Sequence, residues 1–252
     1  MEIITTQLPS GGVGYKFPTI TIKPMTFVDI CSYLENVPKD PMDKYLFDIR
    51  ILTKDDENIK NCYIMDVDFL IFYKKLLTVS NDLSYQIKVT CPDCGAEITK
   101  TIEFNKDIHF KQIDPKIMDG ARVDLGGHRY DTLVPTTNDF MKVFGNYLRY
   151  RTVTDLKMIK TIALIKDFDI LGNQVESDIL NATHEDITLL LALRELYYDL
   201  VEPVTVYCPK CNKGLKKNER RGMAVSVDSL IVDFFRDITI NSPIDGSKII
   251  FK

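Results

Sequence analysis

The sequence predicts an α+β fold in which a β-hairpin module, split into two halves, carries a mainly helical insertion and follows an N-terminal β and helical segment. Three observations predict this fold. Two Cys-Pro-x-Cys turns, Cys91–Cys94 and Cys208–Cys211, each follow a run that alternates apolar and polar residues. The two turns are separated by 113 residues. Most of that gap has apolar residues at helical spacing, so strands at both ends flank inserted helices.

Composition places the chain among ordinary globular proteins. It has 252 residues, 45% of them hydrophobic and 27% charged, with a formal net charge of −4. These values allow one to three domains and give no global field that would attract nucleic acid or an anionic membrane. No apolar run approaches the length of a membrane span, and Met1–Ile4 does not resemble a secretory signal. We therefore expect a soluble protein of a reducing cytoplasm with no membrane contact.

The N-terminal part is expected to span residues 1–82 and to combine a strand pair with helices. Glu2–Leu8 and Thr19–Met25 resemble short strands around a glycine turn. A helical stretch then extends to Ser80, with Thr26 and Asp66 as expected N-caps. Pro38 and Pro41 mark a break inside this stretch.

The split module is expected to cover residues 83–105 and 203–240. Leu83–Thr90 and Ala96–Phe104 alternate as strands on either side of the first turn. Val204–Val206 leads into the second turn, and Gly214–Val227 leads out of it. A short amphipathic helix is expected at residues 228–236.

The insertion is expected at residues 106–202. Its first element is a hairpin, Arg122–Leu125 and His128–Leu133, because Gly126-Gly127 is a favourable two-residue turn. Helices follow; Thr183-His-Glu-Asp186 resembles a capping box, and it precedes Ile187–Leu200, which is apolar enough to be well buried. Two apolar helical stripes come before it: Phe140, Val143, Phe144 and Tyr147, and then Leu156, Ile159 and Ala163.

The four paired cysteines predict a closed metal site. Cys91 and Cys94 form what we call the first knuckle, with Gly95, and Cys208 and Cys211 form the second knuckle. Two residues between cysteines let one turn aim both sulfurs at one ion, and four thiolates complete a structural Zn²⁺ site with no open position for catalysis. Closing the intervening loop costs roughly 4 kcal/mol, less than the 10–16 kcal/mol or so that structural zinc supplies. A redox dithiol, two separate sites or no metal remain the alternatives.

No other residues form a catalytic constellation, so we expect no enzyme and no small-molecule substrate. Cys31 and Cys62 stand alone and are expected to be inert and buried. The segment Gly11–Lys16 lacks the glycine-lysine-hydroxyl order of a phosphate-binding loop. The cluster Asp55-Asp56-Glu57 is typical of a solvated loop. The three histidines, His109, His128 and His184, have neither metal-ligand spacing nor a nucleophile beside them.

One basic concentration follows the second knuckle: Lys213, Lys216, Lys217, Arg220 and Arg221. The alternative function is therefore a zinc-ribbon protein that acts as a nucleic-acid-binding or regulatory factor. Against it, no aromatic residue is interleaved with these cations for stacking on bases. A solvated face or an acidic protein partner is the favoured interpretation.

The order of motifs resembles the baseplate hub and hub assembly proteins of T4-type bacteriophages. The resemblance rests on Leu8-Pro-Ser-Gly-Gly12, on Val89-Thr-Cys-Pro-Asp-Cys-Gly95 and on Val204-Thr-Val-Tyr-Cys-Pro-Lys-Cys211, with Phe234-Phe235 after them. It covers roughly residues 7–236. The chain departs from the pattern at Gly14–Pro18, which is longer than the expected aromatic-proline segment, and at Asn212, which replaces a second glycine.

The resemblance implies a virion or virion-assembly protein, produced late, that helps to build the central hub of a contractile tail baseplate. The implied partners are other phage baseplate or tail proteins. The implied location is the virion tail baseplate, and the host cytoplasm during assembly. No enzymatic activity is implied by the family.

Overall fold

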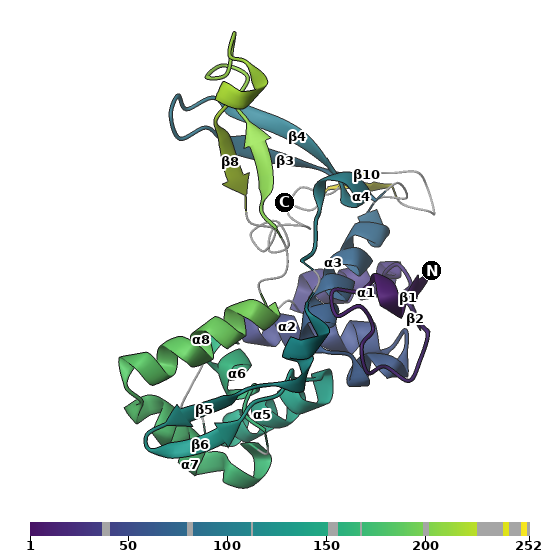
Figure 1. The fold of residues 1–252 in the computed structure, drawn as a ribbon. Helices are drawn as coiled ribbons and strands as arrows, with labels where there is room; N and C mark the ends of the chain where they lie inside the picture. Colours follow the sequence, from purple (N-terminus) through teal and green to yellow (C-terminus); the bar gives the residue numbers. More distant parts are fainter. Residues whose placement is uncertain are drawn as a thin grey trace. The chain divides into compact units, whose positions relative to one another are not determined.

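The protein mixes helices with small antiparallel sheets, as the sequence predicts (Figure 1). A computed structural model describes residues 1–36, 41–79, 83–111, 113–150, 156–166, 168–198, 202–225, 239–241 and 248–250. The chain forms two compact units, each built from two separate stretches. Unit 1 comprises residues 1–71 and 112–200, and unit 2 comprises residues 72–111 and 201–252.

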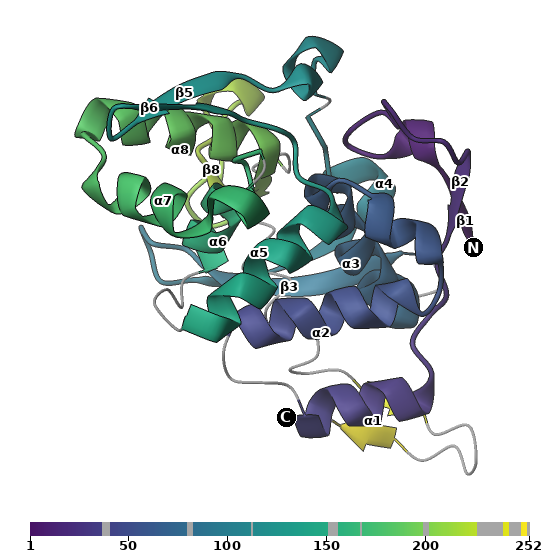
Figure 2. The same ribbon diagram turned by 90° about the horizontal axis from the view of Figure 1, so that it is seen from below.

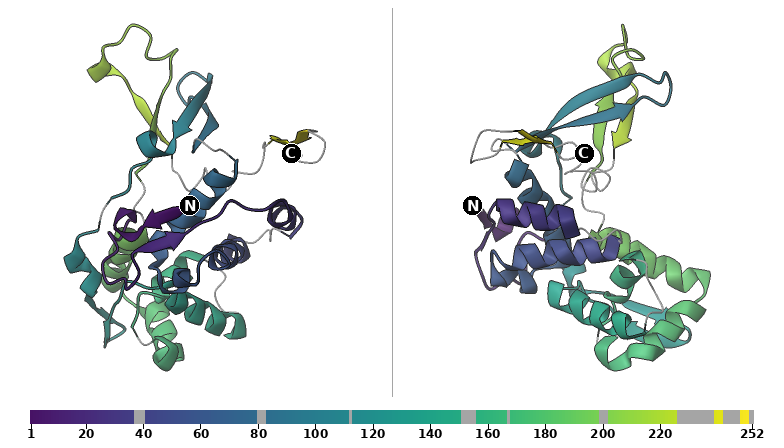
Figure 3. Two further views of the ribbon diagram at one scale, coloured as in Figure 1. Left: turned by 90° about the vertical axis from the view of Figure 1, so that its right-hand side faces the viewer. Right: turned by 180° about the vertical axis from the view of Figure 1, so that it is seen from behind.

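Unit 1 begins with a short antiparallel pair, β1 (Glu2–Ile4) and β2 (Thr19–Thr21), in which Ile3 lies opposite Ile20 (Figure 3). Both strands are shorter than expected. The chain turns into a 3₁₀ helix, η1 (Thr5–Gln7), directly after β1, and the backbone N–H of Thr5 donates to the Pro18 carbonyl at 3.0 Å. The pairing therefore ends where the loop around the glycines begins.

The expected helical stretch consists of α1 (Phe27–Asn36), α2 (Pro41–Thr53), a 3₁₀ helix η2 (Glu57–Asn61) and α3 (Ile64–Val79). Thr26 is the N-cap of α1, as predicted: its hydroxyl accepts from the Asp29 backbone N–H at 3.2 Å. Pro41 is the first residue of α2, where a missing N–H costs nothing. Pro38 lies outside the described residues.

Asp66 is not an N-cap, because α3 already begins at Ile64. Its buried carboxylate instead accepts hydrogen bonds from residues far away in the sequence. The backbone N–H and the hydroxyl of Ser10 donate to it at 2.9 and 2.6 Å, and the Tyr15 hydroxyl donates at 2.5 Å. Tyr15 in turn stacks on Tyr63 and accepts its backbone N–H at 2.7 Å. This network fixes the glycine-containing loop to the start of α3.

The second stretch of unit 1 starts with η3 (Pro115–Asp119) and the hairpin of β5 (Arg122–Leu125) and β6 (His128–Asp131). Leu125 lies opposite His128, and both turn glycines have positive φ, as the Gly-Gly signal predicts. Helices α7 and α8 lie against this hairpin, and α5 and α6 pack with them (Figure 2). They are α5 (Thr137–Tyr150), α6 (Leu156–Ile162), α7 (Phe168–Asn181) and α8 (His184–Tyr198).

Helix α5 follows the prediction, whereas α8 differs from it. Phe140, Val143 and Phe144 are buried, as the stripe on α5 predicts. The Thr183 hydroxyl accepts the Asp186 backbone N–H at 3.3 Å, which confirms the capping box of α8. However, among the described side chains of α8, Leu190, Leu193 and Tyr197 are buried, whereas Ile187 and Leu191 are only partly buried and Leu189 is exposed. The prediction of a well-buried helix was therefore wrong for these last three positions.

Of the expected stripe residues, Ile159 and Ala163 are buried, while the side chains of Tyr147 and Leu156 are outside the described part.

The two stretches of unit 1 share one core. Tyr63 bridges to Thr136, and the Ile64 backbone N–H donates to the Pro135 carbonyl at 3.0 Å. The Thr137 hydroxyl, which is buried, donates to the carbonyl of Ile59 at 2.8 Å. These contacts group residues 1–71 with residues 112–200, whereas the sequence led us to expect separate domains at 1–82 and 106–202.

Unit 2 contains the hairpins of the expected split module. In the first, β3 (Ser84–Thr90) pairs with β4 (Glu97–Glu103) from Ser84↔Glu103 to Thr90↔Glu97, and α4 (Phe104–Asp107) follows. In the second, β7 (Val204–Tyr207) pairs with β8 (Gly222–Val225), with η4 (Lys217–Glu219) between them. A third pair joins β9 (Thr239–Asn241) and β10 (Lys248–Ile250). The predicted helix at 228–236 lies outside the described residues.

The core of unit 2 is small. Ile87, Ile98 and Ile102 of the first hairpin and Val204 and Val206 of the second are buried. The ring of Phe104 stacks on Phe72 of α3, with centroids 5.7 Å apart. Among the described helices of the whole chain, none is long and apolar enough to cross a membrane.

Candidate metal centre

The first knuckle is a tight turn between β3 and β4, closed by the backbone alone. The backbone N–H of Cys91 donates to the Ala96 carbonyl at 2.9 Å, and that of Gly95 donates to the Cys91 carbonyl at 2.9 Å. Gly95 has φ of 67°, a left-handed conformation that glycine adopts without strain. The turn thereby places both cysteines at the end of the hairpin.

The second knuckle follows β7 and is closed partly by a side chain. The Asn212 backbone N–H donates to the Cys208 carbonyl at 3.0 Å, and its side-chain amide donates to the same carbonyl at 2.9 Å. The Asn212 amide also donates to the Arg221 carbonyl at 3.1 Å and accepts the Arg221 backbone N–H at 2.9 Å. Asn212 therefore ties the knuckle to the chain that enters β8.

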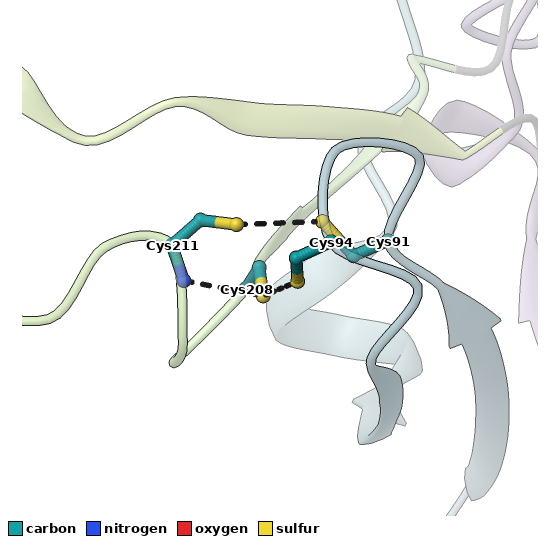
Figure 4. A group of neighbouring side chains, drawn as sticks. All are labelled: Cys91, Cys94, Cys208 and Cys211. Carbon is teal, nitrogen blue, oxygen red and sulfur yellow. Dashed lines mark hydrogen bonds between the residues drawn. The ribbon is translucent and has the colours of Figure 1, made fainter.

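The two knuckles meet, and their four sulfur atoms point toward one another (Figure 4). All four Sγ atoms lie within 4.8 Å of one another. Two of these distances join opposite knuckles: Cys91 to Cys211 at 3.8 Å and Cys94 to Cys208 at 3.7 Å. These separations are far longer than a disulfide bond of about 2.05 Å, and all four cysteines are free.

This geometry fits a tetrahedral metal ion. A zinc ion bound by four thiolates at about 2.3 Å separates the sulfurs by about 3.8 Å. The two sulfur distances between the knuckles agree with that value, and all four cysteines come from two turns held by hydrogen bonds. Cys91 and Cys208 are buried, whereas Cys211 is exposed, so the site lies at the surface of unit 2. The cluster is compatible with a metal site of the predicted composition.

The thiols influence one another electrostatically. The backbone N–H of Cys211 lowers the pKa of the Cys208 thiol to about 7, and the neighbouring Cys94 thiol raises the pKa of Cys211 to about 12. Thiolates at these distances repel, so all four can be ionised together only when a cation sits among them.

The other cysteines and the glycine loop behave as structural residues. Cys62 is buried as expected, and its thiol donates to the Asn58 carbonyl at 3.5 Å, while burial raises the pKa of this thiol. Cys31 is only half-buried, so the prediction of full burial was wrong for it. In the loop of Gly11–Lys16, Tyr15 packs between Phe17 and Tyr63. The loop is thus fastened to α3 instead of forming an open phosphate cradle.

None of the three histidines belongs to the cysteine cluster, which the described residues form from cysteines alone. His109 and His184 are exposed. His128 of β6 contacts Asp178 of α7, with Nδ1 and Oδ2 2.9 Å apart, and Asp178 also accepts from the Tyr130 hydroxyl and from Gln174. The tyrosine and glutamine hydrogen bonds, with His128 nearby, lower the pKa of Asp178. These contacts hold the β5–β6 hairpin on α7, and they were not predicted because the partners are distant in sequence.

The acidic cluster is not simply a solvated loop, which corrects the sequence-based expectation. Asp56 accepts the backbone N–H groups of Asn58 and Thr21, both at 2.9 Å, and Asp55 accepts that of Lys23 at 2.9 Å. These carboxylates therefore satisfy backbone donors at the end of β2 and at the start of η2.

The basic residues after the second knuckle do reach the surface. Lys213, Lys216, Arg220 and Arg221 are exposed, while the side chain of Lys217 is outside the described part. The sequence did not lead us to predict a role for two residues beside them: Asn212, which closes the second knuckle, and Tyr207, whose ring is half-exposed. Asn212 could have been found because asparagine side chains often close turns. Tyr207 could have been found because it is an aromatic residue at an outward-facing strand position.

Comparison of the chain with protein-family models, with curated proteins and with solved structures found no match.

Proposed function

We propose that the protein is a structural or assembly component of the tail baseplate, in the central hub region, of a contractile-tailed bacteriophage. It acts through protein–protein contacts, without enzymatic activity, in the virion baseplate and in the host cytoplasm during assembly. One structural Zn²⁺ bound by Cys91, Cys94, Cys208 and Cys211 stabilises it. In this proposal the two hairpins form a split zinc-ribbon-like module.

The observation that carries the proposal is the convergence of four thiols from turns 114 positions apart. Four sulfurs fill a tetrahedral zinc ion, so no position remains for water or substrate. Such a site supplies folding free energy and not chemistry. A metal that joins distant chain segments stabilises the fold, and this suits a protein that acts by contacting other proteins. The baseplate assignment is supported by the order of the LPSGG motif and the two knuckles.

Elemental analysis of the purified chain tests the metal. We expect about one zinc atom per chain and no iron, which the same four-sulfur geometry could also hold. A preparation that folds fully without bound metal would contradict the zinc proposal.

Mass spectrometry of purified particles tests the baseplate assignment. We expect the protein in virions or in baseplate precursors from infected cells. Its absence from both would refute an assembly role, while the metal result would stand independently.

A nucleic-acid-binding or regulatory factor is the second candidate, favoured by the exposed cations after the second knuckle. It predicts DNA or RNA binding that weakens steeply with salt and on neutralising Lys216, Lys217, Arg220 and Arg221. The absence of any mobility shift at low salt would remove this candidate.

A further inference from the structure

The chain from Tyr207 to Arg221, which we call the basic tip, carries positive charge that the described structure leaves unpaired. Its only acidic residue is Glu219, which accepts the Lys216 backbone N–H at 3.1 Å. Five cations are exposed, and within the described residues none of them forms an ion pair: Lys210, Lys213, Lys216, Arg220 and Arg221. Such a concentration attracts an anionic partner.

Two apolar side chains are exposed on the same tip. Tyr207 is 51% exposed and Leu215 is 38% exposed. Tyr207 lies opposite Gly222 in the β7–β8 pair, and a Cβ at position 222 would lie 3.2 Å from the tyrosine ring. The missing side chain leaves room for the ring beside the strand, while the rest of the ring faces outward. The tip thus offers apolar surface as well as charge.

Hydrogen bonds fix the backbone of the tip on which these side chains stand. Asn212 holds the backbone of Arg221 through two hydrogen bonds, and Arg220 Nε donates to the Leu215 carbonyl at 3.5 Å. Together with the Lys216–Glu219 turn, these bonds place Leu215 beside Arg220 at one end and Tyr207 beside the Arg221–Gly222 segment at the other. The arrangement is fixed before any partner binds, which lowers the entropy cost of binding.

We propose that the basic tip is a docking surface for an acidic protein segment that carries an apolar side chain among its carboxylates. The inference rests on the proposed assembly function, because it names the chemistry of the partner that such a function requires. Carboxylates would pair with the lysines and arginines, and the apolar side chain would cover Leu215. Apolar anchors beside complementary charge give both affinity and orientation.

A nucleic acid fits this surface less well. Binding of single strands uses successive aromatic rings along a continuous positive groove, whereas Tyr207 is the one exposed aromatic ring of the described tip. The adjoining first knuckle exposes an acid, Asp93, beside the cysteine cluster. The four thiolates would also add negative charge, only half of which a divalent ion cancels. A short acidic peptide avoids these groups more easily than a long polyanion.

Fluorescence anisotropy with the full-length, zinc-loaded protein tests the proposal. The probes are a short labelled peptide of glutamate and aspartate with a central leucine, the same peptide with glycine in place of leucine, and oligo-deoxythymidine. We expect the leucine peptide to bind most tightly. The double variant Lys213→Glu/Lys216→Glu should weaken its binding about tenfold or more, and Leu215→Ser should abolish the preference for leucine over glycine.

The control is Lys111→Glu/Lys116→Glu, which reverses two exposed lysines elsewhere and changes the net charge equally. It should leave peptide binding within about twofold, and the zinc content of every variant reports whether the module is folded. Tighter binding of oligo-deoxythymidine, equal loss in the control, or no peptide binding at low salt would each overturn the proposal. None of these outcomes would decide whether the protein belongs to the baseplate, which particle mass spectrometry tests separately.

Discussion

The two compact units join distant chain segments by different chemistry. Unit 1 does so with an apolar core and buried hydrogen bonds, such as those from Ser10 and Tyr15 to Asp66 and from Thr137 to Ile59. In the described part of unit 2 few hydrogen bonds, such as that from the Glu202 N–H to the His109 carbonyl, join the two stretches, and a cluster of four thiols lies between the two hairpins. Two-stranded hairpins are marginally stable alone in water. If the proposed zinc site is formed, unit 2 depends on a metal where unit 1 depends on packing.

The largest expected effect is the loss of stability when a cysteine of the cluster is replaced, and it should be confined to unit 2. Cys91→Ser and Cys208→Ser should each remove zinc and cost more than about 5 kcal/mol in unit 2, because one lost ligand opens the closed site. Hydrogen exchange followed by mass spectrometry should show loss of protection in β3, β4, β7 and β8. Protection in α5 and α8 of unit 1 should persist.

Cys31→Ser is the matched control, since this half-buried thiol lies outside the cluster. It should keep zinc and normal exchange. If Cys91→Ser and Cys208→Ser each retained a full equivalent of zinc, the shared site would be excluded. Equal loss of protection in both units would instead show that the metal supports the whole chain.

The next largest effect is a pH dependence of the stability of unit 1, which arises from the buried carboxyl group of Asp66. Burial raises the pKa of Asp66 to about 6, although hydrogen bonds from Ser10 and Tyr15 oppose this rise. The folded state therefore holds the proton more tightly than the unfolded state, whose carboxyl titrates near 3.8. The stability contributed by this proton is complete below about pH 4 and is lost as pH rises through about 6.

Urea unfolding of the native protein and of Asp66→Asn measures this contribution. The difference in unfolding free energy between the two should change by about 2 kcal/mol from pH 4 to pH 7, in favour of the variant at the higher pH. Parallel pH profiles would mean that Asp66 titrates alike in both states and that its burial costs unit 1 nothing.

The parts that sequence predicted are those whose signals are local. The β3–β4 hairpin, the Gly126-Gly127 turn, the N-cap Thr26 and the capping box at Thr183 each depend on residues a few positions apart. The cysteine cluster was also predictable, because metal chemistry supplies a long-range rule that four spaced thiols satisfy.

The parts that sequence missed depend on partners that no local pattern reveals. Asp66 looks like a helix cap, yet its donors lie about fifty positions earlier, on Ser10 and Tyr15. Helix α8 is apolar on most sides, yet how much of it is buried depends on which neighbours pack against it. The shared core of residues 1–71 and 112–200 likewise follows from tertiary contacts such as Tyr63 with Thr136.

Within unit 2, Asn212→Ala should reveal how differently the two knuckles are closed. The substitution leaves the Arg221 N–H and two carbonyl groups without their side-chain partner, at a cost of about 2 kcal/mol. Asn212→Gly should cost at least as much, although glycine is the residue that follows the cysteines in the first knuckle. Chemical denaturation and competition for zinc with a chelator measure both. Full stability of Asn212→Gly would show that backbone hydrogen bonds alone also close the second knuckle.

The smallest effect on stability is expected in the first knuckle, which backbone hydrogen bonds close. A Cβ at Gly95 meets no atom within 4 Å, so Gly95→Ala costs only the strain of a positive φ, about 1 kcal/mol. Gly95→Asn should cost less, because asparagine tolerates the left-handed region better than alanine does. The same denaturation assay should therefore rank alanine below asparagine at position 95. Equal costs for the two would mean that the turn changes conformation when substituted, and that the first knuckle is held by the metal and not by its glycine.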